Sequence, residues 1–571
     1  MHSDGIKKHG EPAAIRYFTV GTPLAKGSKT NRVDAPGLCS VVRNIKLPGE
    51  RGTAQKASVR GMYGPNSPAI FMDVQTLLVE LLAGYLETPS TEIQVNTPLS
   101  EYGLDSVYAL TVCADVEERL GLVLDPAIMW DYPTVDALSH AIVKIANSSA
   151  APADGQSTQP QHPRNPRSLP TQDLLGEAVL PADITPTPDA LPAASAPYRT
   201  ALVTGATGFA GAFILRELLD RSTAQVFVLV RAQDADDAVR RVRENLTKYG
   251  LWRDDDHRRL VGVAGDLGLP DLGLSQTVYR ELADQVEVII HNGATVNFVL
   301  PYARLKSVNV LGTQEILRLA CRGRIKPVHH VSSLGVIPER PGVQYFAEAE
   351  LTDPADVLGG YRQTKWVSDR LVTLAGSRGL PVCIYRPGSI TGAQATGVSP
   401  MDFVNALITG CTQLRSALEF DVDVLAVPVD FCGAAIVHIA LSGTRHGSVF
   451  HLPGSRPLPW NELIGMVRDC GYPMRSAPYQ QWHDELAAAS GHALVPYLTL
   501  FDQDAPGAEI GVAGNEPHIA TANIDAALMG SGIECRPVNR EMVSSCLDYL
   551  VRLGHLTPPL TEPAALVRPR G

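Results

Sequence analysis

Tyr361 and Lys365 are the residues of this sequence whose types and spacing best suit acid catalysis. They stand at positions i and i+4 of the segment GYRQTKW, so on a helix they share one face. An ammonium group beside a phenol lowers the pKa of the tyrosine, which predicts a proton donor that works near neutral pH. Because Y-x-x-x-K also occurs by chance, the pair indicates a catalytic site only together with other motifs. One of these is Ser332 and Ser333 at the end of an expected strand.

A glycine pattern near residue 205 indicates a dinucleotide site. Gly205, Gly208 and Gly211 follow the run ALVT and precede a helical apolar pattern that extends to residue 219. In such a turn the first glycine allows the tight bend, the second lets the backbone approach a pyrophosphate, and the third packs the helix on the strand. The sequence therefore predicts cofactor contacts from Gly205, Thr207, Gly208, Phe209 and Gly211.

The end of the next apolar run, VFVLVR, carries Arg231 where an NAD-binding fold would place an acidic residue. A guanidinium group favours a 2′-phosphate, so the sequence predicts NADPH. Asp266 and Leu267 follow the third expected strand and are placed to contact the adenine ring, and Asn292 of HNGA completes the expected cofactor set.

Strands that alternate with helices must position these residues. Short β-branched runs recur within 201–219, 225–231, 285–294, 327–336 and 380–388, with helix-compatible segments between them. This alternation predicts an α/β Rossmann fold with a doubly wound parallel sheet. Beyond residue 394 the pattern becomes irregular and ends with helix-like stretches at 460–470 and 540–553.

A second candidate site lies nearer the amino terminus. Ser106 follows Asp105 in YGLDSVYAL at the start of an amphipathic run, 107–120, which lies between similar runs at 71–82 and 135–145. This spacing predicts a small helical bundle. An exposed hydroxyl at a helix start is accessible to a transferase, and the positive end of the helix favours an attached phosphate.

Two family resemblances connect these motifs. The order L-S-x-Y-G-L-D-S with WDYPTVDAL resembles the acyl and peptidyl carrier proteins over about 70–146, and implies 4′-phosphopantetheine on Ser106. The glycine turn, HNGATVNF, VNVLGT, GYRQTKW and YRPGSI together resemble the extended short-chain dehydrogenase/reductases, and within them the thioester reductase domains of polyketide, peptide and carboxylic acid reductase assembly lines, over about 172–560. This second resemblance implies that Ser333 polarises a carbonyl, Tyr361 is the general acid, and Lys365 tunes it and binds the nicotinamide ribose. It also implies that Asn309 supports Lys365 and the active-site helix.

The expected organisation is multi-domain, with an all-α four-helix carrier bundle before the α/β reductase. Its parts are 1–68, a poorly structured tail or the remnant of an adenylating domain; 69–146, the carrier; 147–171, a flexible linker; 172–394, the Rossmann part; and 395–571, mainly an irregular substrate-binding part.

Composition restricts the class of protein. The 571 residues carry a net charge of −11, with 45% hydrophobic and 19% charged residues, which excludes a mainly disordered chain and argues against a nucleic-acid binder. The nine cysteines form no C-x-x-C pair, and the histidines show no metal-ligand spacing, so we expect a reducing cytoplasm and no metal. No apolar run is long enough to span a membrane, and no signal peptide is expected.

Carrier and reductase together predict NADPH-dependent reductive release of an acyl chain from the phosphopantetheinyl thioester as an aldehyde, or as an alcohol after a second reduction, in secondary-metabolite or lipid biosynthesis. The expected partners are a phosphopantetheinyl transferase and an upstream acyl-loading enzyme. Three alternatives remain open: a short-chain dehydrogenase or epimerase that acts on a diffusible substrate, an acyl-CoA reductase, and a docking protein with an inactive reductase.

Overall fold

The computed structural model describes residues 68–85, 89–102, parts of 112–148, 168–298, 300–338, 345–489, 493–494, 512–513 and 518–559. Ser106, most of the expected tail (1–67) and most of the expected linker (149–167) lie outside the described residues. Within the described part, no helix combines the length and apolarity needed to cross a bilayer.

The reductase region is built on a seven-stranded sheet in the order β12-β7-β5-β4-β1-β2-β3, in which every pairing is parallel. Its strands are β1 (Thr200–Thr204), β2 (Gln225–Val230), β3 (Leu260–Ala264), β4 (Val288–His291), β5 (Val328–Val331), β7 (Val382–Pro387) and β12 (Ser448–Leu452). The predicted doubly wound parallel sheet is confirmed. The order of the strands reverses at β1: β2 and β3 follow it on one side, and β4 pairs with it on the other. Ligands bind beyond the carboxyl ends of the strands at such a switch point.

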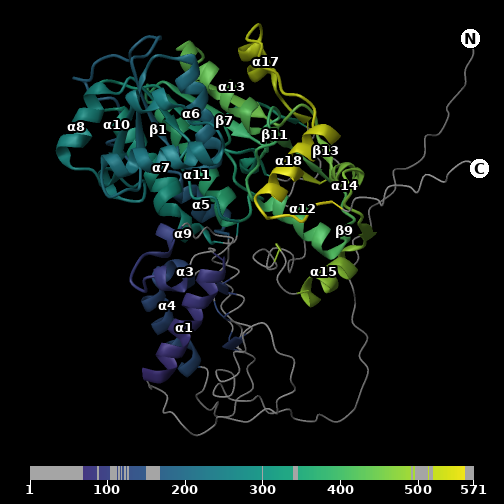
Figure 1. The fold of residues 1–571 in the computed structure, drawn as a ribbon. Coiled ribbons are helices and arrows are strands. Elements are labelled where there is room, and N and C mark those ends of the chain that lie inside the picture. Colours follow the sequence, from purple (N-terminus) through teal and green to yellow (C-terminus); the bar gives the residue numbers. More distant parts are fainter. Residues whose placement is uncertain are drawn as a thin grey trace, which may run out of the picture. The chain divides into compact units, whose positions relative to one another are not determined.

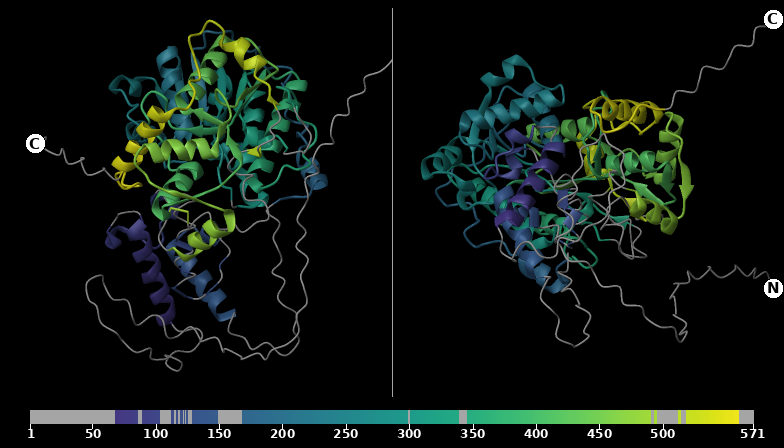
Figure 2. Two further views of the ribbon diagram at one scale, coloured as in Figure 1. Left: turned by 90° about the vertical axis from the view of Figure 1, so that its right-hand side faces the viewer. Right: turned by 60° about the horizontal axis from the view of Figure 1, so that its bottom comes forward.

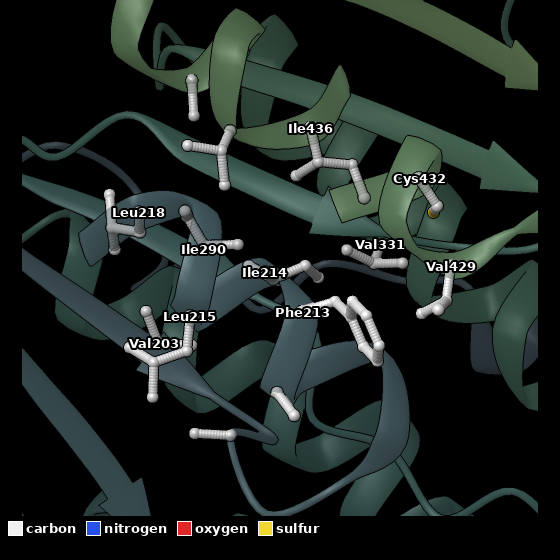
Figure 3. Packing of buried hydrophobic residues seen from close by; sticks show 14 of the residues in the cluster. Val203, Phe213, Ile214, Leu215, Leu218, Ile290, Val331, Val429, Cys432 and Ile436 are labelled. Atoms are coloured by element: carbon white, nitrogen blue, oxygen red, sulfur yellow. The ribbon is translucent and has the colours of Figure 1, made fainter. Parts of the chain in front are cut away.

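Helices cover both faces of the sheet (Figure 1). The main ones are α5 (Thr171–Glu177), α6 (Phe209–Arg221), α7 (Ala235–Lys248), α8 (Gln276–Gln285), α9 (Tyr302–Lys306), α10 (Gly312–Ala320), α11 (Gly360–Ser377) and α13 (Val429–Ser442). One hydrophobic cluster joins α6, α7 and α13 to one face, and the second joins α5, α8, α10 and α11 to the other. Figure 3 shows Phe213, Ile214 and Leu218 of α6 among Val203, Ile436 and other core residues of the first cluster.

The sheet extends beyond the boundary expected at residue 394. Strand β12 pairs in register with β7, Val449 opposite Ile384, and α13 packs against α6. Sequence reading missed β12 because SVFHL is short and has no glycine turn or charged motif to mark it. Some of the chain after 394 therefore completes the Rossmann layer.

A further layer of the reductase region is mainly helical (Figure 2). It contains α12 (Phe403–Leu414), α14 (Trp460–Asp469), α15 (Tyr479–Ala488) and α18 (Arg540–Arg552), and α17 (Ala522–Leu528) lies beside β12. The helices expected at 460–470 and 540–553 are α14 and α18. Its short strands are β9 (Ser416–Leu418), β10 (Val422–Val424), β13 (Leu458–Pro459), β14 (Arg475–Ala477) and β15 (Val512–Ala513); β8 (Ser389–Thr391) pairs with β11 (Ala426–Pro428), and β6 (Tyr345–Phe346) with β16 (His518–Ile519).

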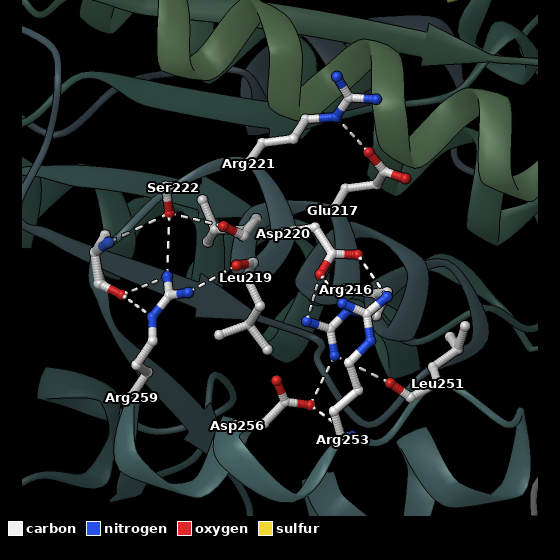
Figure 4. Close-up of polar contacts among 12 residues, drawn as sticks. Arg216, Glu217, Leu219, Asp220, Arg221, Ser222, Leu251, Arg253, Asp256 and Arg259 are labelled. Carbon is white, nitrogen blue, oxygen red and sulfur yellow. Dashed lines mark hydrogen bonds and ion pairs between the residues drawn. The ribbon is translucent and has the colours of Figure 1, made fainter.

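A buried ion pair fixes the carboxyl half of α6 (Figure 4). Arg216 donates to Asp256 at 2.7 Å and to Asp220 at 2.8 Å, and Arg253 also binds Asp220. Because the side chains of Arg216 and Asp256 are 9% and 7% exposed, loss of either partner would leave a buried charge uncompensated. This cluster orients the helix that follows the glycine turn.

The described part of the carrier segment is helical. It contains α1 (Pro68–Tyr85), α3 (Ile128–Asp131) and α4 (Val135–Ser148), with short 3-10 turns at Ser90–Glu92 and Leu99–Tyr102. Leu78, Leu82 and Leu138 are fully buried in a common cluster. The predicted helix at 107–120 falls largely outside the described residues, so the four-helix bundle stays a prediction.

Candidate active site

The glycine turn lies at the switch point of the sheet, between β1 and α6. Gly205 has φ +74, and its carbonyl accepts from the Gly208 N–H at 3.1 Å. A Cβ on Gly211 would lie 1.9 Å from the Gly205 oxygen, so only glycine allows the helix to approach the turn. No side chain caps the first turn of α6, which leaves its N–H groups available to an anion.

Two residues that sequence reasoning missed hold this turn. Asn245 of α7 donates to the carbonyls of Ala206 and Gly208, each at 3.1 Å. Gly293 approaches so closely that a Cβ on Gly205 would lie 2.8 Å from its Cα. The signal for Gly293 was its place in HNGA directly after β4, whereas Asn245 is an ordinary polar residue on an amphipathic helix.

The other expected cofactor residues lie at the same edge of the sheet. Asn292 follows β4, and its side chain reaches the Gly205 carbonyl at 3.5 Å. Asp266 follows β3 and accepts from the Gly268 N–H at 2.8 Å, which fixes the loop that carries Leu267. Thr207 is exposed within the turn. The Phe209 ring packs edge-on against Phe213 and Tyr249, at centroid distances of 5.4 and 5.2 Å, so a phosphate would meet its backbone N–H and not its ring.

Two arginines meet at the end of β2. Arg231 is exposed, and its backbone carbonyl accepts a hydrogen bond from the Arg241 guanidinium of α7. Asp234 caps α7 by accepting from the Asp237 N–H at 2.8 Å, which fixes the helix that carries Arg241. Arg231 is predicted from its motif position, whereas no motif marks Arg241, whose approach depends on how α7 packs.

Helix α11 carries Tyr361 and brings Lys365 to the end of β5. The Lys365 ammonium donates to the Val331 carbonyl at 2.7 Å, and the neighbouring Arg362 donates to the Gly335 carbonyl at 2.7 Å. These bonds attach the start of α11 to the loop that carries Ser333. The Ser333 hydroxyl oxygen accepts from the Gly335 N–H at 3.0 Å, and its own O–H can still donate.

The Tyr361 ring lies in apolar surroundings. It contacts Phe298 edge to face with ring centroids 5.3 Å apart and packs against Leu300 and Leu305. Burial raises the pKa of Tyr361 to about 12. The lowering by lysine expected from the sequence is not found in this structure, where the Lys365 ammonium binds the Val331 carbonyl. Tyr361 is therefore a phenol over the whole neutral range and can donate a proton.

Burial lowers the pKa of Lys365 to about 8, and the nearby negative charge of Asp369 opposes this shift. Lys365 is 4% exposed. Its ammonium form is present below about pH 8 and is lost as the pH rises through that value. Any role that needs the positive charge of Lys365 therefore has an alkaline limit near pH 8.

Asn309 lies in a single π-helical turn, Ser307–Leu311, a distortion common at functional sites. Its amide donates to Thr364 Oγ1 of α11 and to the Thr295 carbonyl, each at 3.0 Å, and its oxygen accepts from the Thr295 N–H at 2.7 Å. Asn309 thus connects α11 to the loop after β4, through Thr364.

The buried histidines form part of the framework. His291 lies between Thr204 and Thr313, at 2.8 and 3.1 Å, and burial lowers its pKa to about 3. Among the described residues, no group of three or more His, Cys, Asp and Glu side chains is arranged to hold a metal ion.

Comparison with known proteins assigns the two regions. Residues 203–436 match the NAD-binding family model described as Male sterility protein, and residues 76–142 match the model described as Phosphopantetheine attachment site. The solved terminal R domain of the myxalamid PKS-NRPS biosynthetic pathway is 38% identical, with a TM-score of 0.64 over 68% of this chain and 100% of that chain. The chain belongs to the R-domain family.

Curated relatives of this R-domain chain are longer proteins. Isonitrile lipopeptide synthase of Streptomyces coeruleorubidus is 32% identical over 80% of this chain and 31% of its own length. Aldehyde reductase lnbA of Aspergillus flavus is 32% identical over 76% of this chain and 43% of its own length. The R-domain chain thus spans less than half the length of these relatives.

Proposed function

We propose that this chain reductively releases an acyl group from a phosphopantetheinyl thioester on Ser106, with NADPH as the reductant. The product is an aldehyde, or an alcohol after a second reduction, in secondary-metabolite or lipid biosynthesis. A phosphopantetheinyl transferase attaches the arm, and an upstream enzyme loads the acyl group. The observation that carries the proposal is that one chain contains both a phosphopantetheine attachment domain and an R domain.

The residues at the switch point fit a dinucleotide. A Cβ at Gly205 or Gly211 would clash with neighbouring backbone, so the two glycines keep the turn tight, and the uncapped N–H groups of α6 suit a pyrophosphate. Arg231 and Arg241 suit a 2′-phosphate, and Lys365 suits the nicotinamide ribose. When bound, the cofactor supplies a hydride.

The chain's own residues stabilise charge at the thioester carbonyl. As the carbonyl carbon becomes tetrahedral, its oxygen gains negative charge, and the Ser333 and Tyr361 hydroxyls donate hydrogen bonds to it. Tyr361 transfers its proton to that oxygen. The C–S bond then breaks and the sulfur leaves as a thiol with a proton from solvent. The hydroxyl proton returns to the Tyr361 phenolate as the C=O bond reforms, which releases an aldehyde and regenerates the phenol. Phe298 and Leu300 keep the phenol in apolar surroundings, where these interactions are strongest.

NADPH oxidation by the chain should require an acyl thioester. We expect a chain loaded on Ser106 with an octanoyl-phosphopantetheine probe to oxidise NADPH in a single turnover, and the unacylated chain to oxidise none. Absorbance at the NADPH band measures this directly. Equal oxidation with and without the octanoyl group would contradict the proposal.

Gly211→Ala should abolish cofactor binding. The new methyl group would lie 1.9 Å from the Gly205 oxygen, so the turn must move, at a cost of about 1–3 kcal/mol in stability. NADPH fluorescence titration and urea unfolding measure the two effects. The matched control is Gly465→Ala in α14, where nothing lies within 4 Å of the new Cβ and we expect a gain of about 0.5–1 kcal/mol. Unchanged NADPH affinity in Gly211→Ala would contradict the placement of the cofactor.

Arg231→Asp should weaken NADPH and leave NADH nearly unchanged. The change removes a charged hydrogen bond to the 2′-phosphate, worth roughly 1.5–3 kcal/mol, which corresponds to about 10- to 150-fold in affinity. The matched control is Arg258→Asp, the same charge change at an exposed side chain. Arg258 lies just before β3, at the amino end of that strand and away from the edge where the cofactor is expected. Equal affinity of the parent chain for NADPH and NADH would show that Arg231 does not select the cofactor.

A further inference from the structure

A buried ion pair, Asp369 with Arg386, lies next to the segments that carry the candidate catalytic residues. Arg386 of β7 binds Asp369 of α11 through two parallel hydrogen bonds, Nε to Oδ2 at 2.9 Å and Nη2 to Oδ1 at 2.8 Å. The two side chains are 0% and 2% exposed. Burial of both charges costs desolvation energy that their attraction often only balances, so net stability is a weak explanation for such a pair.

The pair is connected to the catalytic residues from two sides. Asp369 lies one helical turn after Lys365 and shares its face of α11. Its Oδ2 also accepts from the Ser332 hydroxyl at 2.7 Å, and Ser332 immediately precedes Ser333. Because the Lys365 ammonium binds the adjacent Val331 carbonyl at 2.7 Å, two successive residues of the β5 end are attached to two successive turns of α11.

The other side of Arg386 binds segments that are remote in sequence. Its Nη1 donates to the Ala349 carbonyl at 2.9 Å and lies 3.3 Å from His451 Nε2. The second ring nitrogen of His451 lies 3.1 Å from the Ala520 carbonyl. Glu348 accepts from the His451 N–H at 2.9 Å and also from the N–H of Asn523. The guanidinium group of Arg386 is thus connected to residues 345–350, which follow the loop after Ser333. Through His451 it is also connected to residues 518–524.

We infer that Asp369 and Arg386 are positioning residues of the reductase reaction, which hold Ser333 and Lys365 in register and anchor the segments 345–350 and 518–524 behind them. The inference rests on the proposed function, because it assigns a role in that reaction. A displacement of about 1 Å in a catalytic group can cost about 10²-fold in rate, so this register matters for turnover.

Ser332→Ala tests the link without breaking the ion pair. We expect kcat for octanoyl-CoA reduction to fall about tenfold, with NADPH affinity and thermal midpoint close to parental values. Ser332→Thr retains the hydroxyl and should restore most of the rate. The matched control is Ser368→Ala, which removes a buried hydroxyl of α11. That hydroxyl donates to the backbone carbonyl of Lys365 at 3.0 Å and does not bind Asp369. Parental kcat in Ser332→Ala would overturn the inference.

Asp369→Asn adds a readout that a purely structural role would not change. The charged and titratable groups around Lys365 are Asp369, its partner Arg386, Tyr361, His291 and His330. Burial keeps both histidines neutral and raises the pKa of Tyr361 to about 12. The variant removes the negative charge that raises the pKa of Lys365, so the alkaline limb of the kcat profile should move from near pH 8 to lower pH by about one unit. A folded Asp369→Asn chain with an unmoved limb would overturn the inference; if it does not fold, Ser332→Ala decides.

Amide hydrogen exchange separates this inference from the proposed function. In Ser332→Ala, exchange at residues 331–335 should become faster than in the parent and in Ser368→Ala, whether or not the chain reduces a thioester. Failure of the parent to reduce octanoyl thioesters would refute the proposed function alone. Unchanged exchange at 331–335 would refute the positioning role alone.

Discussion

Tyr361→Phe is expected to slow reduction of the thioester by about 10²- to 10⁴-fold, the usual contribution of a general acid. The ring and its contacts with Phe298, Leu300 and Leu305 are retained, so fold and NADPH affinity should persist. Only the hydroxyl that donates to the carbonyl oxygen is lost. Stopped-flow NADPH oxidation by the octanoyl-loaded chain measures the rate, and fluorescence titration measures binding.

The matched control for that variant is Tyr302→Phe. Tyr302 is also packed near the start of α11, but its hydroxyl binds Glu177 at 3.1 Å and has no place in the proposed reaction. We expect its rate to match the parent. A parental rate in Tyr361→Phe would remove Tyr361 from the chemistry.

Ser106→Ala is expected to abolish both arm attachment and reduction of carrier-bound acyl groups. An alanine has no hydroxyl for the transferase, so the mass gain of one phosphopantetheine should disappear. Free octanoyl-CoA should still be reduced at the parental rate, because the R domain is unaltered. Intact-mass spectrometry after treatment with a transferase and CoA checks the first result.

Ser90→Ala is the matched control in the carrier segment. Ser90 is an exposed hydroxyl residue of the turn Ser90–Glu92, and its loss should leave attachment complete. Arm attachment to Ser106→Ala, or its absence in Ser90→Ala, would show that the modified residue has been misassigned.

Local sequence patterns predicted the parts of the fold that depend on neighbours in the chain. The turn at Gly205 was recognisable because a tight bend and a close helix approach each require glycine at a fixed offset. The strands that end at Thr204 and Val230 were recognisable because strands buried on both faces are continuously apolar.

Tertiary contacts determine what the sequence did not reveal. Asp369 and Arg386 are separated along the chain and meet only because α11 packs behind β7. The high pKa of Tyr361 follows from Phe298 and Leu300, which no spacing rule places beside it. For the same reason no sequence motif marked the contacts of Arg241 and Asn245, both on α7.

Product analysis of a single turnover tests the central claim most directly. The chain is loaded on Ser106 with octanoyl-phosphopantetheine and given NADPH, and the released compound is identified by mass spectrometry while oxidised cofactor is counted. We predict octanal with one NADPH oxidised per acyl chain, or octanol with two, and a free thiol on the arm. Release of octanoic acid with no NADPH oxidised would contradict reductive release.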